Sequence, residues 1–120
     1  MEELHAKATS VAAKFLERRG YEVLGNEIDT DAGIVDNLEI DDNEDIVFVD
    51  VTVSASPREG HHVSSLSRDQ RERQAVYVLA GGLTEGRADC TVRFDEIALV
   101  VVNDNRGLLR HHINCLQKMD

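Results

Sequence analysis

The sequence predicts an α/β fold in which helices flank a mixed central β-sheet. Residues 2–19 place apolar side chains at helical spacing, and Gly20 supplies a stop signal directly after them. Residues 45–53 hold the densest run of β-branched and aromatic residues in the chain, which is typical of a central strand covered on both faces. A helix expected at 64–80 separates this strand from a long apolar strand at 91–102. That connection permits the two strands to pair in parallel.

Turn residues divide the rest of the chain into shorter strands. Because the turns on either side of the second of these strands are short, an antiparallel meander is expected up to residues 45–53. Ser64 or Ser65 is expected to cap the second helix, and Ala98–Val102 is expected to be fully buried. The additional strands are predicted at residues 21–28 and 33–40, and residues 108–113 are expected to form a final strand, paired as a hairpin, or a short helix.

Size and charge limit the class of protein. A chain of 120 residues is expected to form a single domain over residues 1–120. Its net charge of −10 argues against a surface that binds nucleic acid mainly by neutralising phosphates, but leaves room for a local basic patch. The N-terminus is acidic and helical rather than a signal peptide, and Cys90 and Cys115 are expected to be free thiols. We therefore expect a cytoplasmic, soluble protein.

Polar residues interrupt the two strands at the centre of the predicted sheet. Asp50 lies within the apolar run, where a buried carboxylate costs several kcal/mol unless it is paired, hydrated or bound to a metal. Thr52 faces the same side of the strand, because side chains alternate with a period of two. Asp36 lies on the preceding strand. An acidic site is one interpretation, and carboxylates that reach solvent or pair with arginine are the other.

Other polar groups favour a structural interpretation. His61–His62 and His111–His112 are adjacent pairs whose side chains point in different directions, and no metal-binding spacing accompanies them, so surface histidines are expected. Phe94 is expected in the core. Arg93 is expected to pair with Asp95 or with a neighbour in the sheet.

Five short signatures occur in an order that resembles the bacterial YraN-type family, which has the PD-(D/E)XK fold of restriction endonucleases and Holliday-junction resolvases. The resemblance runs through most of the chain and implies a three-layer restriction-endonuclease-like fold. It also implies Mg²⁺ as a cofactor and DNA or RNA as a partner. The signatures are Ala12–Tyr21, Gly33–Asp36, Val47–Thr52, Arg93–Val100 and His112–Asn114.

The resemblance also assigns roles, and the chain departs from several of them. In such nucleases two acidic groups hold Mg²⁺, which activates water, and a lysine orients that water or stabilises the transition state. Asp36 and Asp50 stand at the two acidic positions. Thr52 stands at the lysine position, and its hydroxyl has no positive charge and is a poor base at neutral pH. Thr9 and Ile34 stand where the family carries glutamates.

Arginines near the second helix are the candidates for the missing positive charge. Arg58, Arg68 and Arg71 are the nearest by topology, and we expect them to contact nucleic acid, although arginine cannot act as a base. The sequence thus predicts a nuclease-like, nucleic-acid-associated protein with weak or no hydrolysis of phosphodiesters. If active, it would be a Mg²⁺-dependent DNA or RNA endonuclease. The alternative is a non-enzymatic interaction domain that binds a protein partner or forms a homodimer.

Overall fold

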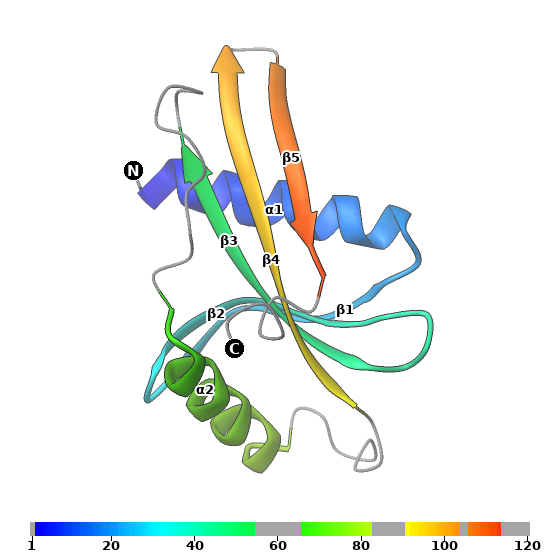
Figure 1. Cartoon of the computed structure of the whole chain (residues 1–120), viewed down its shortest axis with the longest axis vertical. Helices are drawn as coiled ribbons and strands as arrows, with labels where there is room; N and C mark the ends of the chain where they lie inside the picture. Colours follow the sequence, from blue (N-terminus) through cyan, green and yellow to red (C-terminus); the bar gives the residue numbers. More distant parts are fainter. Residues whose placement is uncertain (1, 55–65, 83–90, 104–105, 114–120) are drawn as a thin grey trace.

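The described part of the chain contains five strands and two helices (Figure 1). The computed structural model describes residues 2–54, 66–82, 91–103 and 106–113, so Cys90 and Cys115 lie outside the described residues. Neither described helix is long and apolar enough to cross a membrane. The elements are α1 (Glu2–Arg18), β1 (Glu22–Thr30), β2 (Gly33–Ile40), β3 (Ile46–Ser54), α2 (Arg68–Ala80), β4 (Val92–Asn103) and β5 (Arg106–His112).

The strands form one mixed sheet in the order β1-β2-β3-β4-β5. The pairs β1–β2, β2–β3 and β4–β5 are antiparallel, which confirms the predicted meander and the final hairpin. β3 and β4 are parallel, and α2 lies in the connection between them. The predicted mixed α/β sheet with two helices is therefore present, with β3 at its centre.

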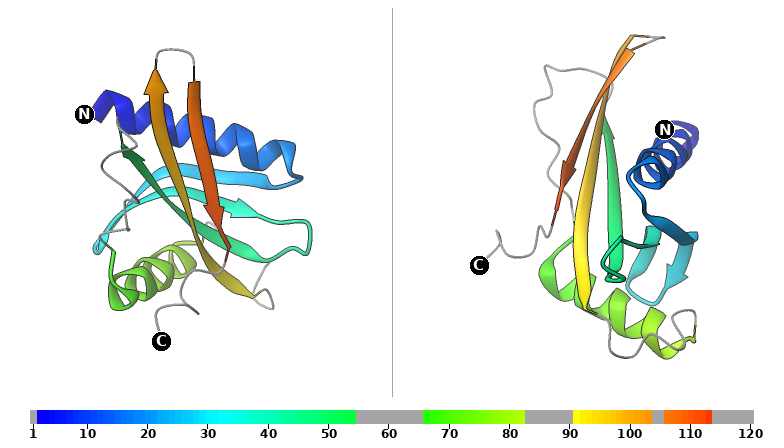
Figure 2. Two further views of the ribbon diagram at one scale, coloured as in Figure 1. Left: turned by 45° about the horizontal axis from the view of Figure 1, so that its top comes forward. Right: turned by 90° about the vertical axis from the view of Figure 1, so that its right-hand side faces the viewer.

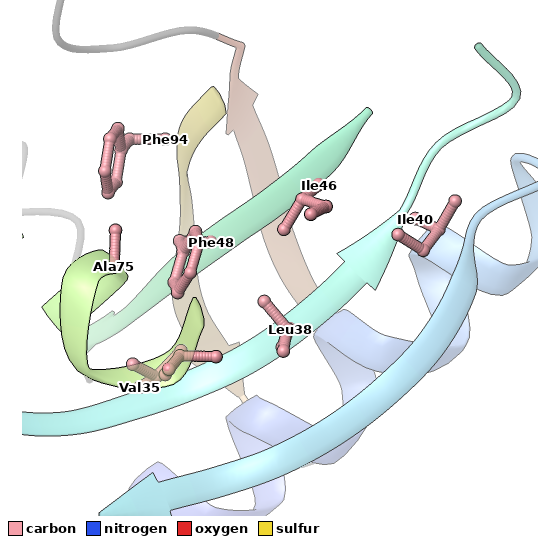
Figure 3. Packing of buried hydrophobic residues seen from close by; sticks show 8 residues of the cluster. Val35, Leu38, Ile40, Ile46, Phe48, Ala75 and Phe94 are labelled. Carbon is pink, nitrogen blue, oxygen red and sulfur yellow. The ribbon is translucent and has the colours of Figure 1, made fainter. Parts of the chain in front are cut away.

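The two helices lie on opposite faces of the sheet (Figure 2). Because side chains alternate along β3, the core is divided between these two faces. Val47, Val49 and Val51 pack with the apolar side of α1. Ile46 and Phe48 point to the other face. There they belong to a hydrophobic cluster that includes Ala75 of α2 (Figure 3). On that face the Phe48 and Phe94 rings stack with their centroids 5.5 Å apart, next to Ala75 of α2.

Two details of the prediction are wrong. The cap of α2 is Ser67, whose side chain accepts a hydrogen bond from the Gln70 N–H, and not Ser64 or Ser65. Residues 98–101 are only partly buried rather than fully buried. The α2-side cluster reaches along β4 only as far as Phe94 among the described residues, so the second half of that strand is left without a helix on this face.

Candidate functional site

The site begins where β2 separates from β3. Their antiparallel register ends with the pair Asn37–Val49, and the next pair in this register would be Asp36 and Asp50. Asp36 instead bonds through its side chain, because its Oδ2 accepts the Val51 backbone N–H at 2.8 Å. The Asp36 carboxylate thus accepts a hydrogen bond that a backbone carbonyl of β2 would accept if the pairing continued. This bond fixes the two strands in position where they separate.

A third carboxylate continues this row on the next strand. In the parallel register of β3 and β4, Asp50 lies opposite Glu96. Asp36, Asp50 and Glu96 therefore occupy neighbouring positions on three adjacent strands. The sequence analysis singled out the first two and missed Glu96. A signal for it existed, since Glu96 lies two residues after the core residue Phe94 and therefore faces the same side.

Arg71 reaches this row from α2. Its side chain is only 3% exposed, and its Nη2 lies 3.7 Å from Asp50 Oδ2 and 3.6 Å from Glu96 Oε2. Arg71 belongs to the buried stripe of α2, with Gln74, Ala75 and Val78 at helical spacing. Its predicted contact with nucleic acid stays a prediction, but the guanidinium is directed into the protein, where it neutralises part of the carboxylate charge.

The environment of Asp36 makes its carboxyl group easier to protonate than an aspartate in solution. Burial raises the pKa of Asp36 to about 6, and the nearby Asp50 charge acts in the same direction, whereas the Val51 hydrogen bond and His5 lower it. His5 of α1 lies with its Nε2 3.0 Å from the Val51 carbonyl oxygen and 3.5 Å from Asp36 Oδ1. The sequence analysis did not select His5, which lies one helical turn before the buried Thr9.

Thr52 lies two residues beyond Asp50, on the same side of β3. Its hydroxyl oxygen is buried and has no hydrogen-bond partner among the described residues. Arg68 is on the exposed side of α2 and pairs with Glu72 at 3.2 Å. Arg58 and His61–His62 lie outside the described residues. The predicted roles of Arg58 and Arg68 in nucleic-acid contact stay predictions.

A small pocket lies between the carboxylates and α2. It is lined by Asp36, Asp50, Arg71, Phe48 and Phe94, among others, and has a volume of about 10 Å³. That volume is close to the ~10–15 Å³ that one water molecule requires. The pocket can therefore hold a water, but it cannot hold a nucleotide unless α2 moves.

The carboxylates of this row already interact with protein groups. Mg²⁺ requires hard oxygen ligands in near-octahedral geometry at roughly 2.1 Å. The described residues contain no group of three His, Cys, Asp or Glu side chains placed to hold a metal. Asp50 and Glu96 already share the Arg71 guanidinium, and one oxygen of Asp36 accepts the Val51 N–H. A cation would have to displace Arg71 before these carboxylates could surround it.

A separate polar network lies on the α1 face of the sheet. Arg93 bonds Asp95 at 2.9 Å, Asp41 at 2.7 Å and the Tyr21 hydroxyl at 2.8 Å, which confirms the predicted Arg93–Asp95 pair. His111 Nε2 lies 2.7 Å from Asp95 Oδ2. The prediction that His111 lies on the surface is therefore wrong: the buried carboxylate of Asp95 draws the imidazole inward.

Comparison with known proteins adds no family assignment. No protein-family model matches the sequence, and a search of curated proteins gives no match. What can be said of function therefore depends on the geometry of the residues described above.

Proposed function

We propose that the chain is a nuclease-fold protein that associates with nucleic acid and has little or no metal-dependent phosphodiester hydrolysis. Its mixed sheet with helices on opposite faces agrees with the three-layer restriction-endonuclease-like fold that the resemblance to the YraN-type family implies. The proximity of Asp36 and Asp50 at the opening between β2 and β3 also agrees with that family's acidic positions.

The observation that carries the proposal is the position of Arg71 between Asp50 and Glu96. Metal-dependent hydrolysis needs an ion with open coordination positions that bind water and the phosphate. A buried guanidinium supplies positive charge to the carboxylates, but it has no such positions and does not lose its proton to act as a base. Thr52 supplies neither charge nor a base at the lysine position. Under this proposal the site keeps acidic groups at the family's positions, and a guanidinium stands where a metal ion and a lysine would act.

Association with DNA or RNA is supported by the family resemblance and has to involve a local surface. The overall charge of −10 repels phosphates, so contact has to use local basic side chains, and we place it near α2, where Arg68 is exposed. Binding should weaken as salt increases, because contacts with phosphates release counterions. Arg68→Ala should weaken binding, whereas Lys14→Ala on α1 should leave it unchanged.

Cleavage assays with Mg²⁺ or Mn²⁺ test the catalytic part of the proposal. Wild-type protein should not cut plasmid DNA or single-stranded RNA above background. The variant Arg71→Met should bind Mn²⁺ more tightly, measured by calorimetry, because it removes the guanidinium that Asp50 and Glu96 share. Adding Asp50→Ala to that variant should remove the gain. Cleavage by the wild-type protein that disappears in Asp50→Ala would show an intact nuclease and refute the proposal.

A further inference from the structure

A second hollow, distinct from the carboxylate pocket, lies along the outer side of α2. Its volume is about 680 Å³, and it extends from the helix to the turn between β1 and β2. The turn contributes Asp31, and α2 contributes two apolar and three charged side chains along with smaller residues. The principal side chains are Asp31, Asp69, Glu72, Arg73, Val76 and Tyr77.

The floor of this hollow is apolar and exposed. Val76 is 68% exposed and Tyr77 is 49% exposed, although both lie in the middle of a helix. The protein's own core does not use them, because α2 packs on the sheet through the opposite stripe that contains Ala75 and Val78. Neighbouring exposed apolar side chains with a polar rim are typical of interaction sites.

The rim of the hollow is predominantly acidic. Asp31, Asp69 and Glu72 face one basic residue, Arg73. Glu72 also pairs with Arg68, but both side chains are about half exposed, and such a pair at the surface is weak. A second copy of a chain with a charge of −10 would bring like charges together. The electrostatics therefore favour a cationic partner over self-association.

The hollow is held in shape by two glutamines. Gln70 and Gln74 donate from Nε2 to the Ala32 carbonyl oxygen at 2.8 and 3.2 Å, which fixes the turn against α2. Gly33 permits this approach: it has a φ of 112°, and a Cβ there would lie 3.2 Å from the Gln74 amide nitrogen. Since the wall and the floor are already positioned, a partner does not have to order them.

We propose that this hollow is a docking site for a cationic protein segment, specifically an amphipathic helix whose apolar side chains are flanked by lysines or arginines. Its apolar side chains would contact Val76 and Tyr77, and its basic side chains would approach Asp31 and Asp69, as in other helix-in-groove complexes. The inference goes beyond the nuclease-like function and does not depend on the Asp50 cluster. The sequence analysis left open that the protein is an interaction domain, and the hollow supplies the surface and the class of partner for that role.

The test measures binding of a fluorescent model peptide to the full chain by anisotropy. The peptide is built from leucine and lysine at helical spacing, and a matched peptide carries glutamate in place of lysine. Val76→Ser should weaken binding of the lysine peptide about tenfold, because it removes a central apolar contact. Leu108→Ser on β5 is the matched control, as Leu108 is also a well-exposed apolar residue. Asp31→Lys tests the rim, with Asp42→Lys in another turn as its control.

The proposal is supported if the lysine peptide binds, the glutamate peptide does not, and only Val76→Ser and Asp31→Lys weaken binding. Absence of binding overturns it. Equal weakening by Asp42→Lys overturns it as well, because binding would then follow overall charge. A concentration-dependent dimer in sedimentation experiments that Val76→Ser abolishes would assign the surface to a second copy and overturn the proposed partner. Circular dichroism of each variant verifies that the fold is retained.

Discussion

Replacement of Glu39 by glutamine should make the stability of the protein much less dependent on pH between pH 4.5 and pH 8. The Glu39 side chain is fully buried beneath α1, and both its oxygens lack hydrogen-bond partners among the described residues. Burial and, to a smaller extent, the charge of Glu17 on α1 raise the pKa of Glu39 to about 8. Near neutral pH the folded protein therefore holds this carboxyl group mainly in its neutral form.

The size of the effect follows from the difference in pKa between the folded and unfolded chain. Each unit corresponds to about 1.4 kcal/mol, and the pKa rises from 4.5 to about 8. Because the folded state binds the proton more tightly, the stability is complete below pH 4.5 and falls as the pH rises to about 8. Glutamine has a similar shape and does not ionise. Glu39→Gln should therefore match the wild type at low pH and exceed its stability by about 4 kcal/mol at pH 8.

Urea unfolding followed by circular dichroism between pH 4.5 and pH 8 measures this difference. A gain of about 4 kcal/mol is easily resolved, because domains of this size are stable by roughly 5–15 kcal/mol. Asp42→Asn replaces an exposed carboxylate and should leave the pH dependence as in the wild type. If the stabilities of Glu39→Gln and the wild type stay parallel across this range, Glu39 does not carry the proposed proton and the reasoning is wrong.

Three other substitutions probe the core and the buried charges. Asp36→Asn should stabilise the protein by about 2–3 kcal/mol at pH 7 but not at pH 4, since the pKa of Asp36 is raised to about 6; thermal unfolding at both pH values measures this, and equal effects would contradict it. Phe48→Ala should cost about 3–5 kcal/mol in urea unfolding, because it removes the ring stacked on its neighbour in β4, and Phe48→Leu should cost less. Arg93→Met should cost about 3–5 kcal/mol in urea unfolding near neutral pH, because it removes the cation that Asp41 and Asp95 share and leaves Asp95 with His111; a loss below about 1 kcal/mol would show that the network contributes little.

The order and type of the elements could be predicted because each has a strong local signal. The run at 45–53 is apolar on both faces, and the structure places it at the centre of the sheet. Gly20 follows α1 as expected, and Gly81 caps the end of α2. The cap of α2 was misplaced because several serines precede the helix and each satisfies the preference for a capping hydroxyl. Only the geometry of Ser67 distinguishes it from the others.

Asp36 and Asp50 could be selected from the sequence, because Asp50 interrupts an apolar run and both stand at the acidic positions that the family resemblance implies. The residues around them could not. Arg71 lies in a segment so rich in charge that the sequence favours a solvated helix face, and its burial depends on how α2 is rotated over the sheet. Glu96 and His5 come from distant elements. Their approach depends on the parallel register of β3 and β4 and on the position of α1.

The buried polar groups are concentrated where the two central strands meet the helices. On one face Arg71 compensates the charge of Asp50 and Glu96, whereas on the other Glu39 and Asn37 keep oxygens without partners in the described residues. Such groups cost stability, and well-packed apolar residues often stabilise a protein more. The polar groups on β2, β3 and β4 therefore cost the folded chain stability unless a proton, as on Glu39, or a guanidinium, as beside Asp50 and Glu96, compensates their charge.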